Sequence, residues 1–258
     1  QVQYTTDTDS FKKVESSFSN ALNKESIERV FKYDGDVEGK GFLDEISILC
    51  HEGKFDKALS QLKTGNRNYT NNPIFWNVVG TCYSMQGERR KALLFYNKAL
   101  SLKKNYAPAY NNLGVMYLKE QDYSRALVAF KKAKKLNQFS KTPRYNLAHL
   151  YLNFGLYDHA ISNATAILTE NKKDVDVLNF LGTAFLMQGN YQESLSYFNE
   201  IDSDFYEEPS IGINFALAKF LGGEKEEGRD FLEDVESKKM SRSWKIYLKS
   251  VKKYMGVK

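Results

Sequence analysis

Few residues of this sequence have the types and spacings that support catalysis or metal binding. The chain holds only three histidines and two cysteines. Cys50, His51 and Cys82 lack the closely paired spacing of a zinc site. No Ser/His/Asp grouping, glycine-rich phosphate loop or pair of carboxylates stands out. We therefore expect no enzymatic activity, no metal, no cofactor and no small-molecule substrate.

Asparagine is the polar residue that recurs at a regular place. It stands at Asn77, Asn111, Asn112, Asn146, Asn153, Asn179 and Asn214. Because asparagine is a poor helix former, helix propensity does not explain these positions. Its amide donates and accepts hydrogen bonds at once, so it can pair with both halves of a peptide bond. The pattern indicates a surface that holds a protein segment by its backbone, although a merely polar, solvent-facing surface also fits.

Composition and charge describe a chain that folds. It has 258 residues, of which 42% are hydrophobic and 27% charged, which is enough for a sizeable core. No apolar stretch approaches the roughly 18 residues needed to span a bilayer. Residues 73–140 hold 12 Lys and Arg against 3 Asp and Glu, whereas residues 175–208 hold 7 acids and no Lys or Arg. We interpret these segments as solvated helix faces, with docking to an acidic protein, an anionic lipid surface or nucleic acid as alternatives.

A 34-residue repeat organises most of the chain. The string W-x-x-V-G-x-x-Y that begins at Trp76 returns as Y-x-x-L-G-x-x-Y from Tyr110. The string A-x-x-x-Y-x-x-A from Ala92 returns with phenylalanine in its centre from Ala126. Six units follow one another without an insertion, at residues 39–72, 73–106, 107–140, 141–174, 175–208 and 209–242.

Each unit is expected to form two helices joined by a tight turn. Apolar residues recur at three- and four-residue steps in both halves of a unit. Glycine stands between the halves, as at Gly87, where it permits the left-handed backbone that ends a helix. All four prolines fall in the first three residues of a unit, where a helix begins. Small residues such as Gly80 and Ala92 should let the two helices approach closely.

Both ends of the array are expected to carry caps, because a stacked array leaves an apolar face at each end. We expect a tether and capping helices in residues 1–38 and a capping helix in residues 243–258. The sequence does not decide whether two copies of the chain associate through the C-terminal capping helix. The first residue is Gln1 rather than Met, so the N-terminus is either processed or trimmed. We expect membrane contact only through a lipid anchor that has been removed. The compartment stays open, with the bacterial periplasm or outer membrane slightly favoured over the cytoplasm. Two cysteines cannot form a disulfide framework, so both are predicted to lie in the core or line a groove.

This pattern resembles the tetratricopeptide repeat (TPR) family over residues 39–242. The resemblance is carried by the 34-residue period, the W-x-x-V-G-x-x-Y and Y-x-x-L-G-x-x-Y strings and the small–aromatic–small pattern of the second helices. It implies an all-α fold, a right-handed superhelix of helical hairpins with a concave inner surface. The implied role is a non-catalytic scaffold or adaptor that binds a peptide or helix of a partner protein.

The resemblance also places a binding groove on the face of each first helix that lies opposite the stripe of Trp76 and Gly80. On a helical wheel, Ser84, Met85 and Val115 lie on this face. The residues predicted to bind the partner are Asn77, Thr81, Asn111, Asn112, Lys119, Tyr145, Asn146, His149, Asn153, Asn179, Phe180, Thr183, Met187 and Asn214. The asparagines would hold the backbone of the partner, and the aromatic and methionine side chains would supply apolar contact.

Two alternative functions are weighed against this one. The architecture of six units with a polar front resembles pilotin-type outer-membrane lipoproteins, which assist the assembly of type IV pilus secretins. An RNA-binding helical repeat is the second alternative. The related pentatricopeptide arrays have a 35-residue period and another consensus, whereas this sequence keeps the shorter period throughout. The period therefore disfavours nucleic acid as the partner.

Overall fold

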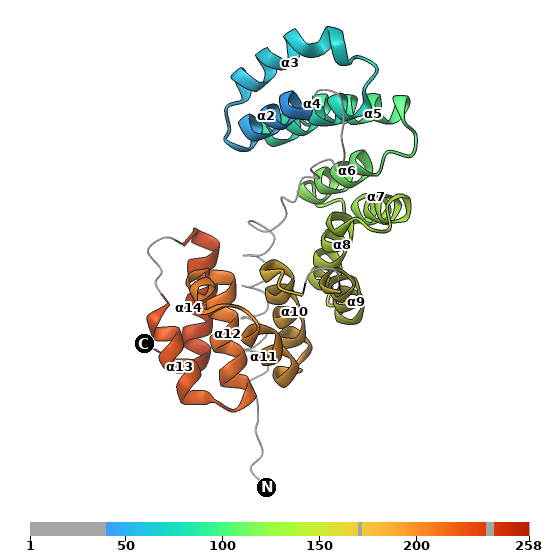
Figure 1. Cartoon of the computed structure of the whole chain (residues 1–258). Coiled ribbons are helices and arrows are strands. Elements are labelled where there is room, and N and C mark those ends of the chain that lie inside the picture. The colour runs from blue at the N-terminus through green and yellow to red at the C-terminus, as the bar shows by residue number, and fades with distance from the viewer. Residues whose placement is uncertain (1–39, 170–171, 236–239, 258) are drawn as a thin grey trace. The chain divides into compact units, whose positions relative to one another are not determined.

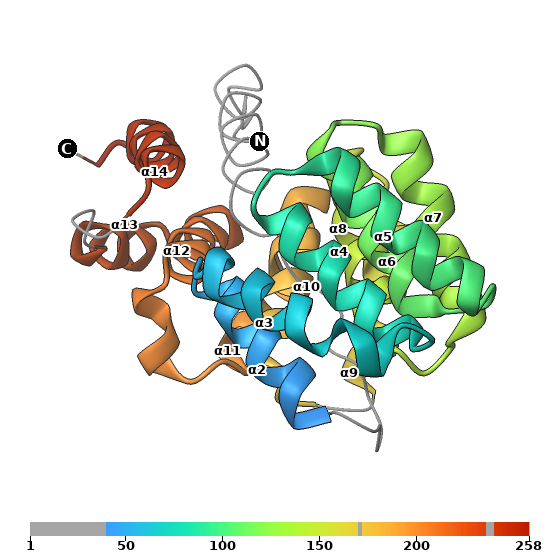
Figure 2. The same cartoon turned by 90° about the horizontal axis from the view of Figure 1, so that it is seen from above.

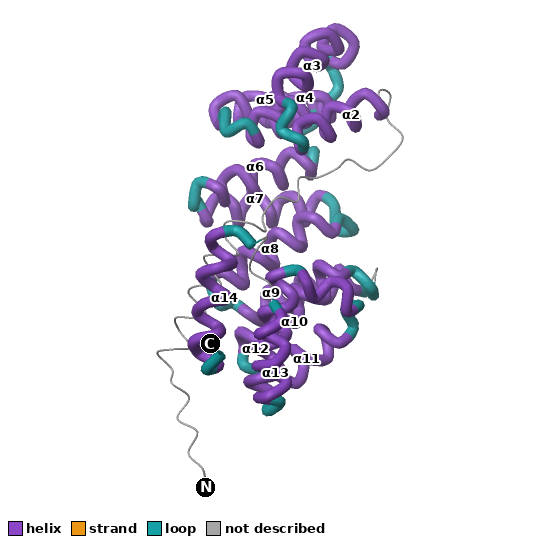
Figure 3. Tube along the Cα trace, turned by 90° about the vertical axis from the view of Figure 1, so that its left-hand side faces the viewer, coloured by secondary structure: helices purple, strands orange, loops and turns teal. Residues whose placement is uncertain are grey.

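The protein is built from helices. The computed structural model describes residues 40–169, 172–235 and 240–257, and every regular element in these ranges is a helix (Figure 3). The fold is therefore all-α, as predicted. These residues form two compact units, which we call the N-terminal unit (residues 40–147) and the C-terminal unit (residues 148–257). The tether and capping helices expected in residues 1–38 lie outside the described residues.

The N-terminal unit consists of antiparallel helix pairs that follow one another along the chain (Figure 1). Its helices are α2 (Lys40–His51), α3 (Phe55–Tyr69), α4 (Pro73–Met85), α5 (Arg89–Leu102), α6 (Ala107–Lys119), α7 (Tyr123–Leu136) and the first half of α8 (Lys141–Asn153). The first helices α4 and α6 are buried over most of their length, whereas α5 and α7 bury only a narrow stripe. The first helices are therefore the centre of this unit.

The C-terminal unit continues the same alternation after the second half of α8. Its helices are α9 (Tyr157–Leu168), α10 (Val175–Gln188), α11 (Tyr191–Asn199), the 3₁₀ helix η1 (Ser203–Glu207), α12 (Pro209–Gly222), α13 (Lys225–Asp234) and α14 (Arg242–Met255). The last helix packs against α12 (Figure 2). Its apolar stripe, which includes Trp244 and Tyr247, is buried there.

Local sequence explains where the helices start and stop. Pro73 and Pro108 stand in the first turn of α4 and α6, where proline costs no hydrogen bond. The side chain of Asn72 caps α4 by accepting from the N–H of Ile74 at 2.8 Å. Gly87, with φ of 85°, ends the same helix in the left-handed region. Most of the turns between paired helices use a glycine in this way.

The two helices of a hairpin meet at a small residue that faces an aromatic ring. A Cβ atom at Gly114 would lie 2.5 Å from the ring of Phe130, and one at Gly80 would lie 2.7 Å from the ring of Tyr96. Both rings are almost completely buried. The sequence predicted close approach but paired each glycine with an alanine. The nearest atoms instead belong to the aromatic residue one turn further along the second helix.

One second helix is shorter than the repeat predicts. Helix α11 ends at Asn199, and the chain then forms η1 before α12 begins. Tyr206 anchors η1, because its hydroxyl donates to the carbonyl oxygen of Phe198 at 3.0 Å and its ring stacks on that of Phe215. The spacing of the repeat is thus kept while the last turns of a helix are replaced by a different element.

A disulfide joins two successive first helices of the N-terminal unit. Cys50 of α2 and Cys82 of α4 are both buried, and their Cα atoms lie 5.3 Å apart, inside the normal range for this bond. The sequence analysis placed both residues in the core or along a groove, and both lie in the core, but it did not predict the bond between them. Neither cysteine is free.

Replacing Gly114 by alanine should destabilise the N-terminal unit. The added methyl group would collide with the buried ring of Phe130, and overpacking of this kind costs about 1–3 kcal/mol. Gly41→Ala is the matched control, because a Cβ atom there meets no atom within 4 Å and alanine is the better helix former. Urea denaturation followed by circular dichroism measures both, and equal midpoints for the two variants would contradict the packing described here.

Reduction of the Cys50–Cys82 bond should lower the free energy of unfolding. The two cysteines are 32 residues apart in sequence, and closing a loop of that size stabilises a protein by about 3–4 kcal/mol. Denaturation with and without dithiothreitol measures the difference. The Cys50→Ser/Cys82→Ser variant should show no response to the reductant, and an equal response of both proteins would mean that the bond plays no part.

Candidate functional site

A continuous row of polar side chains crosses the first helices of the N-terminal unit. Asn112 of α6 donates through Nδ2 to Oδ1 of Asn77, at 3.1 Å, and to Oγ1 of Thr81, at 3.2 Å, both on α4. Asn111 donates to Oδ1 of Asn112 at 3.3 Å, and Asn146 of α8 donates to Oδ1 of Asn111 at 2.9 Å. We call these five residues the amide relay. It brings together five of the predicted site residues.

The amide relay is buried, and its hydrogen bonds are made within the chain. Asn111 has no exposed surface, and the other four members are also buried. Tyr96 of α5 extends the relay by donating its hydroxyl to Oγ1 of Thr81 at 3.3 Å. Burial raises the pKa of Tyr96 to about 12, so this hydroxyl stays a donor at neutral pH. Because buried amides need partners, the relay holds neighbouring helices in register.

A similar set of bonds lies in the C-terminal unit. Asn214 of α12 donates to Oγ1 of Thr183 on α10 at 3.0 Å, and the hydroxyl of Tyr247 on α14 donates to Oδ1 of Asn214 at 2.6 Å. Asn179 donates to Oγ of Ser210 at 3.1 Å. Burial raises the pKa of Tyr247 above its usual range. Thr183, Asn214 and Tyr247 therefore connect three helices in the way that the amide relay does.

The remaining predicted site residues differ in how far their side chains are exposed. Tyr145, His149, Phe180 and Met187 are buried, and the rings of His149 and Phe180 meet edge to face at 4.7 Å. Two predicted residues, Asn153 and Asn179, are half-buried. Lys119, near the C-terminus of α6, is the exposed one among the predicted residues. Their use in partner binding stays a prediction.

Three predicted residues line a small hollow in the N-terminal unit. Thr81, Asn112 and Lys119 surround it together with Ser84, Met85 and Val115, which the helical wheel placed on the same face. Tyr96 also lines it. The sequence analysis gave Tyr96 only as the centre of the A-x-x-x-Y-x-x-A string, and nothing in that string indicated that its side chain borders a hollow. The hollow combines hydroxyl, amide, thioether and aliphatic groups with one cation.

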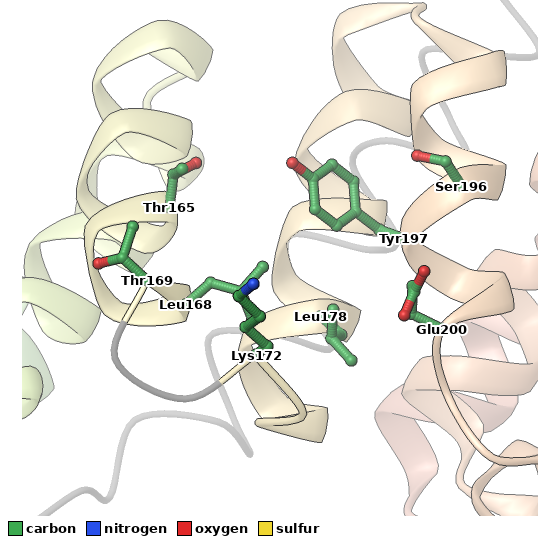
Figure 4. Close-up of a pocket in the computed structure, with 8 residues that line it drawn as sticks. All are labelled: Thr165, Leu168, Thr169, Lys172, Leu178, Ser196, Tyr197 and Glu200. Atoms are coloured by element: carbon green, nitrogen blue, oxygen red, sulfur yellow. The ribbon is translucent and has the colours of Figure 1, made fainter.

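A second, larger hollow lies in the C-terminal unit and was not predicted (Figure 4). Its volume is about 460 Å³, and it is lined by Thr165, Leu168, Thr169, Lys172, Leu178, Ser196, Tyr197 and Glu200. Figure 4 shows the ring of Tyr197 on one side and the threonines of α9 on the other. Its lining comes from the C-terminal part of α9, from Lys172 in the segment before α10, from the buried Leu178 of α10 and from the C-terminal part of α11.

The residues that line the two hollows do not form a metal centre. Within the described ranges, no three His, Cys, Asp or Glu side chains gather in a way that could hold a metal ion. No helix among those residues is long and apolar enough to cross a membrane.

Models of one family match the chain at the level of sequence. They describe the tetratricopeptide repeat and match residues 107–139 and residues 145–206. Residues 107–139 and 145–206 of the chain are thus tetratricopeptide repeats. Members of this family are in general non-catalytic scaffolds that bind other proteins. The TPR fold of this chain thus supports a role as a protein-interaction scaffold. No curated protein matches its sequence.

Solved structures share this fold, and two of them are described as TPR proteins. A tetratricopeptide repeat protein from Parabacteroides merdae ATCC 43184 is 21% identical with a TM-score of 0.57, over 95% of this chain and 94% of that one. YrrB, described as a TPR protein with an unusual peptide-binding site, is 20% identical with a TM-score of 0.59, over 74% and 97%. PilW, described as a widely conserved type IV pilus biogenesis factor, is 16% identical with a TM-score of 0.62, over 83% and 100%.

Replacing Asn112 by alanine should destabilise the N-terminal unit. The change removes two donated hydrogen bonds and one accepted bond of the amide relay. Each buried polar group left without a partner costs about 1–3 kcal/mol. Asn97→Ala, at an exposed position of α5, is the control and should change stability by less than about 0.5 kcal/mol. Urea denaturation distinguishes them, and equal stability of the two variants would refute the structural role of the relay.

Proposed function

We propose that this TPR chain is a non-catalytic scaffold that binds a segment of a partner protein along the first helices of its N-terminal unit. The amide relay carries this proposal. Because the relay fixes α4, α6 and α8 side by side, the groups next to it are held in place before a partner arrives. A preformed surface loses less conformational entropy on binding.

The hollow beside the relay has a volume of only about 10 Å³, so a peptide would contact the groups around it and no side chain would enter it. Met85 and Val115 offer apolar contact, Ser84 offers a hydroxyl, and the exposed Lys119 stands at the edge as a cation. A partner would place an apolar side chain against the first two and an acidic group near Lys119. Extended peptides and amphipathic helices both bind to surfaces of this kind. Among the solved structures of the same fold, YrrB is described as having a peptide-binding site.

A second candidate function is that of a pilotin-like lipoprotein that assists a type IV pilus secretin. The Cys50–Cys82 disulfide favours it, because disulfides persist in oxidising compartments such as the bacterial periplasm. PilW, which shares the fold, is described as a type IV pilus biogenesis factor. In this function the partner segment would belong to a secretin, and the binding surface would be the same.

Reversing the charge at Lys119 should weaken peptide binding. Peptides selected on the wild-type protein from a random display library are the probe. Lys119→Glu should raise their dissociation constants about tenfold, which corresponds to roughly 1.4 kcal/mol. Lys63→Glu, an exposed change on α3 of the same unit, is the control. Fluorescence anisotropy measures both variants, and equal affinities would place the binding surface elsewhere.

A further inference from the structure

The outer faces of the second helices carry opposite charges in the two units. Positions exactly one repeat apart along the chain are equivalent. At one such position the N-terminal unit has Lys98 on α5 and Lys132 on α7, whereas the C-terminal unit has Glu200 at the end of α11. All three side chains are exposed. At this position α5 and α7 thus carry cations, whereas α9 carries the neutral Ala166 and α11 is followed by the acid Glu200.

The cations of the N-terminal unit exceed what its own acids neutralise. Between residues 73 and 140 the acids are Glu88, Glu120 and Asp122, and each already pairs with a cation of the same unit. Seven cations make no ion pair with any described residue: Arg90, Lys98, Lys103, Lys104, Lys131, Lys132 and Lys135. We call the exposed side of α5 and α7 the basic outer face.

The basic outer face also exposes two aliphatic side chains. Leu94 and Val128 occupy equivalent positions on α5 and α7, and they are 63% and 69% exposed. Each stands one turn before a lysine, Lys98 or Lys132. Burial, together with the positive charges of Arg144 and Lys131, lowers the pKa of Lys134 on α7. The face therefore combines apolar contact with uncompensated positive charge.

The C-terminal unit has the complementary surface. Residues 175–208 hold no Lys or Arg. Six of their exposed acids make no ion pair with any residue the structure describes: Glu193, Glu200, Asp202, Asp204, Glu207 and Glu208. We call this side of α11 and η1 the acidic outer face. The large hollow lies directly beside it, with Glu200 on its rim and Leu168, Leu178 and Tyr197 in its wall (Figure 4).

We propose that copies of this chain associate head to tail, with the basic outer face of one copy on the acidic outer face of the next. Leu94 or Val128 would enter the large hollow, while the lysine that follows each would meet Glu193 or Glu200. Two different surfaces form such a contact, so it is heterologous and propagates into a ring or a filament. Opposite charges on the two faces would steer the encounter.

A second copy of the chain would use both the basic and the acidic outer face, whereas a lipid surface or a nucleic acid would use only one of them. An anionic lipid surface or a nucleic acid would use the basic outer face alone. Either would leave six acids with a neighbouring apolar hollow unexplained. The chain itself supplies a partner with matching charge and with a cavity for the aliphatic side chains. The basic outer face of one copy is therefore the partner of the acidic outer face of another.

Sedimentation velocity over a range of protein concentrations tests the association. At low ionic strength the wild-type chain should form species heavier than a monomer. These species should disappear at about 1 M salt, where the Debye length is roughly 3 Å. A protein that stays monomeric at all concentrations in low salt would overturn the proposal.

Two neutralising variants make the test specific. Lys98→Gln/Lys132→Gln removes charge from the basic outer face, and Glu193→Gln/Glu200→Gln removes it from the acidic outer face. All four side chains are exposed, so the helical spectrum should not change. Each variant alone should lose the heavier species. An equimolar mixture should recover a dimer and nothing larger, because only one intact face of each kind remains.

Other results would reject the assignment. Unchanged association of both variants, or a mixture that stays monomeric, would show that these faces do not meet. A wild-type monomer that floats with phosphatidylserine vesicles or binds an RNA oligonucleotide, and loses this binding in Lys98→Gln/Lys132→Gln, would assign the basic outer face to an anionic partner instead. The peptide-binding surface beside the amide relay is unchanged in both variants, so its function is tested separately.

Discussion

The rest of the structure depends on how closely two helices approach at one small residue in each hairpin. In three hairpins a methyl group at this position would lie within 3 Å of an aromatic ring on the second helix, at Gly80, Gly114 and Gly182. In each case the ring belongs to the helix that follows directly along the chain, so the contact is local in sequence. It buries an aromatic ring of the second helix and sets the distance between the two helices. The other core residues pack within this spacing.

Hydrogen bonds between amides provide the second constraint, which acts between hairpins. Asn112 meets Asn77, and Asn146 meets Asn111, across 35 residues. An apolar interface would tolerate a helix that slides or rotates, whereas a buried amide is satisfied only when its partner is opposite. A buried polar row of this kind can specify register. Tyr247 provides the corresponding bond to the last helix by donating to Asn214.

Sequence reasoning reached the all-helical fold because its signals are local. Apolar periodicity, proline in the first turns and glycine between helices all act within a few residues. The disulfide was missed because the distance between Cys50 and Cys82 depends on how α2 packs against α4. The burial of Asn111 was missed for a related reason. A helical wheel places a residue on a face, but it does not reveal whether the next helix covers that face.

The two constraints separate the positions that must stay fixed from those that are able to differ. At one inward position of the second helices the repeats keep Ala92, Ala126, Ala160 and Ser194, all buried and small. Further along the same helices, at an outward position, they carry Lys98, Lys132, Ala166 and Glu200. Packing requires the first set to be alike and places no demand on the second. Because the inner amides are occupied in holding the helices together, we expect differences in recognition to be concentrated at exposed positions. What distinguishes this chain from another array of the same fold is therefore carried by side chains that contribute little to its stability.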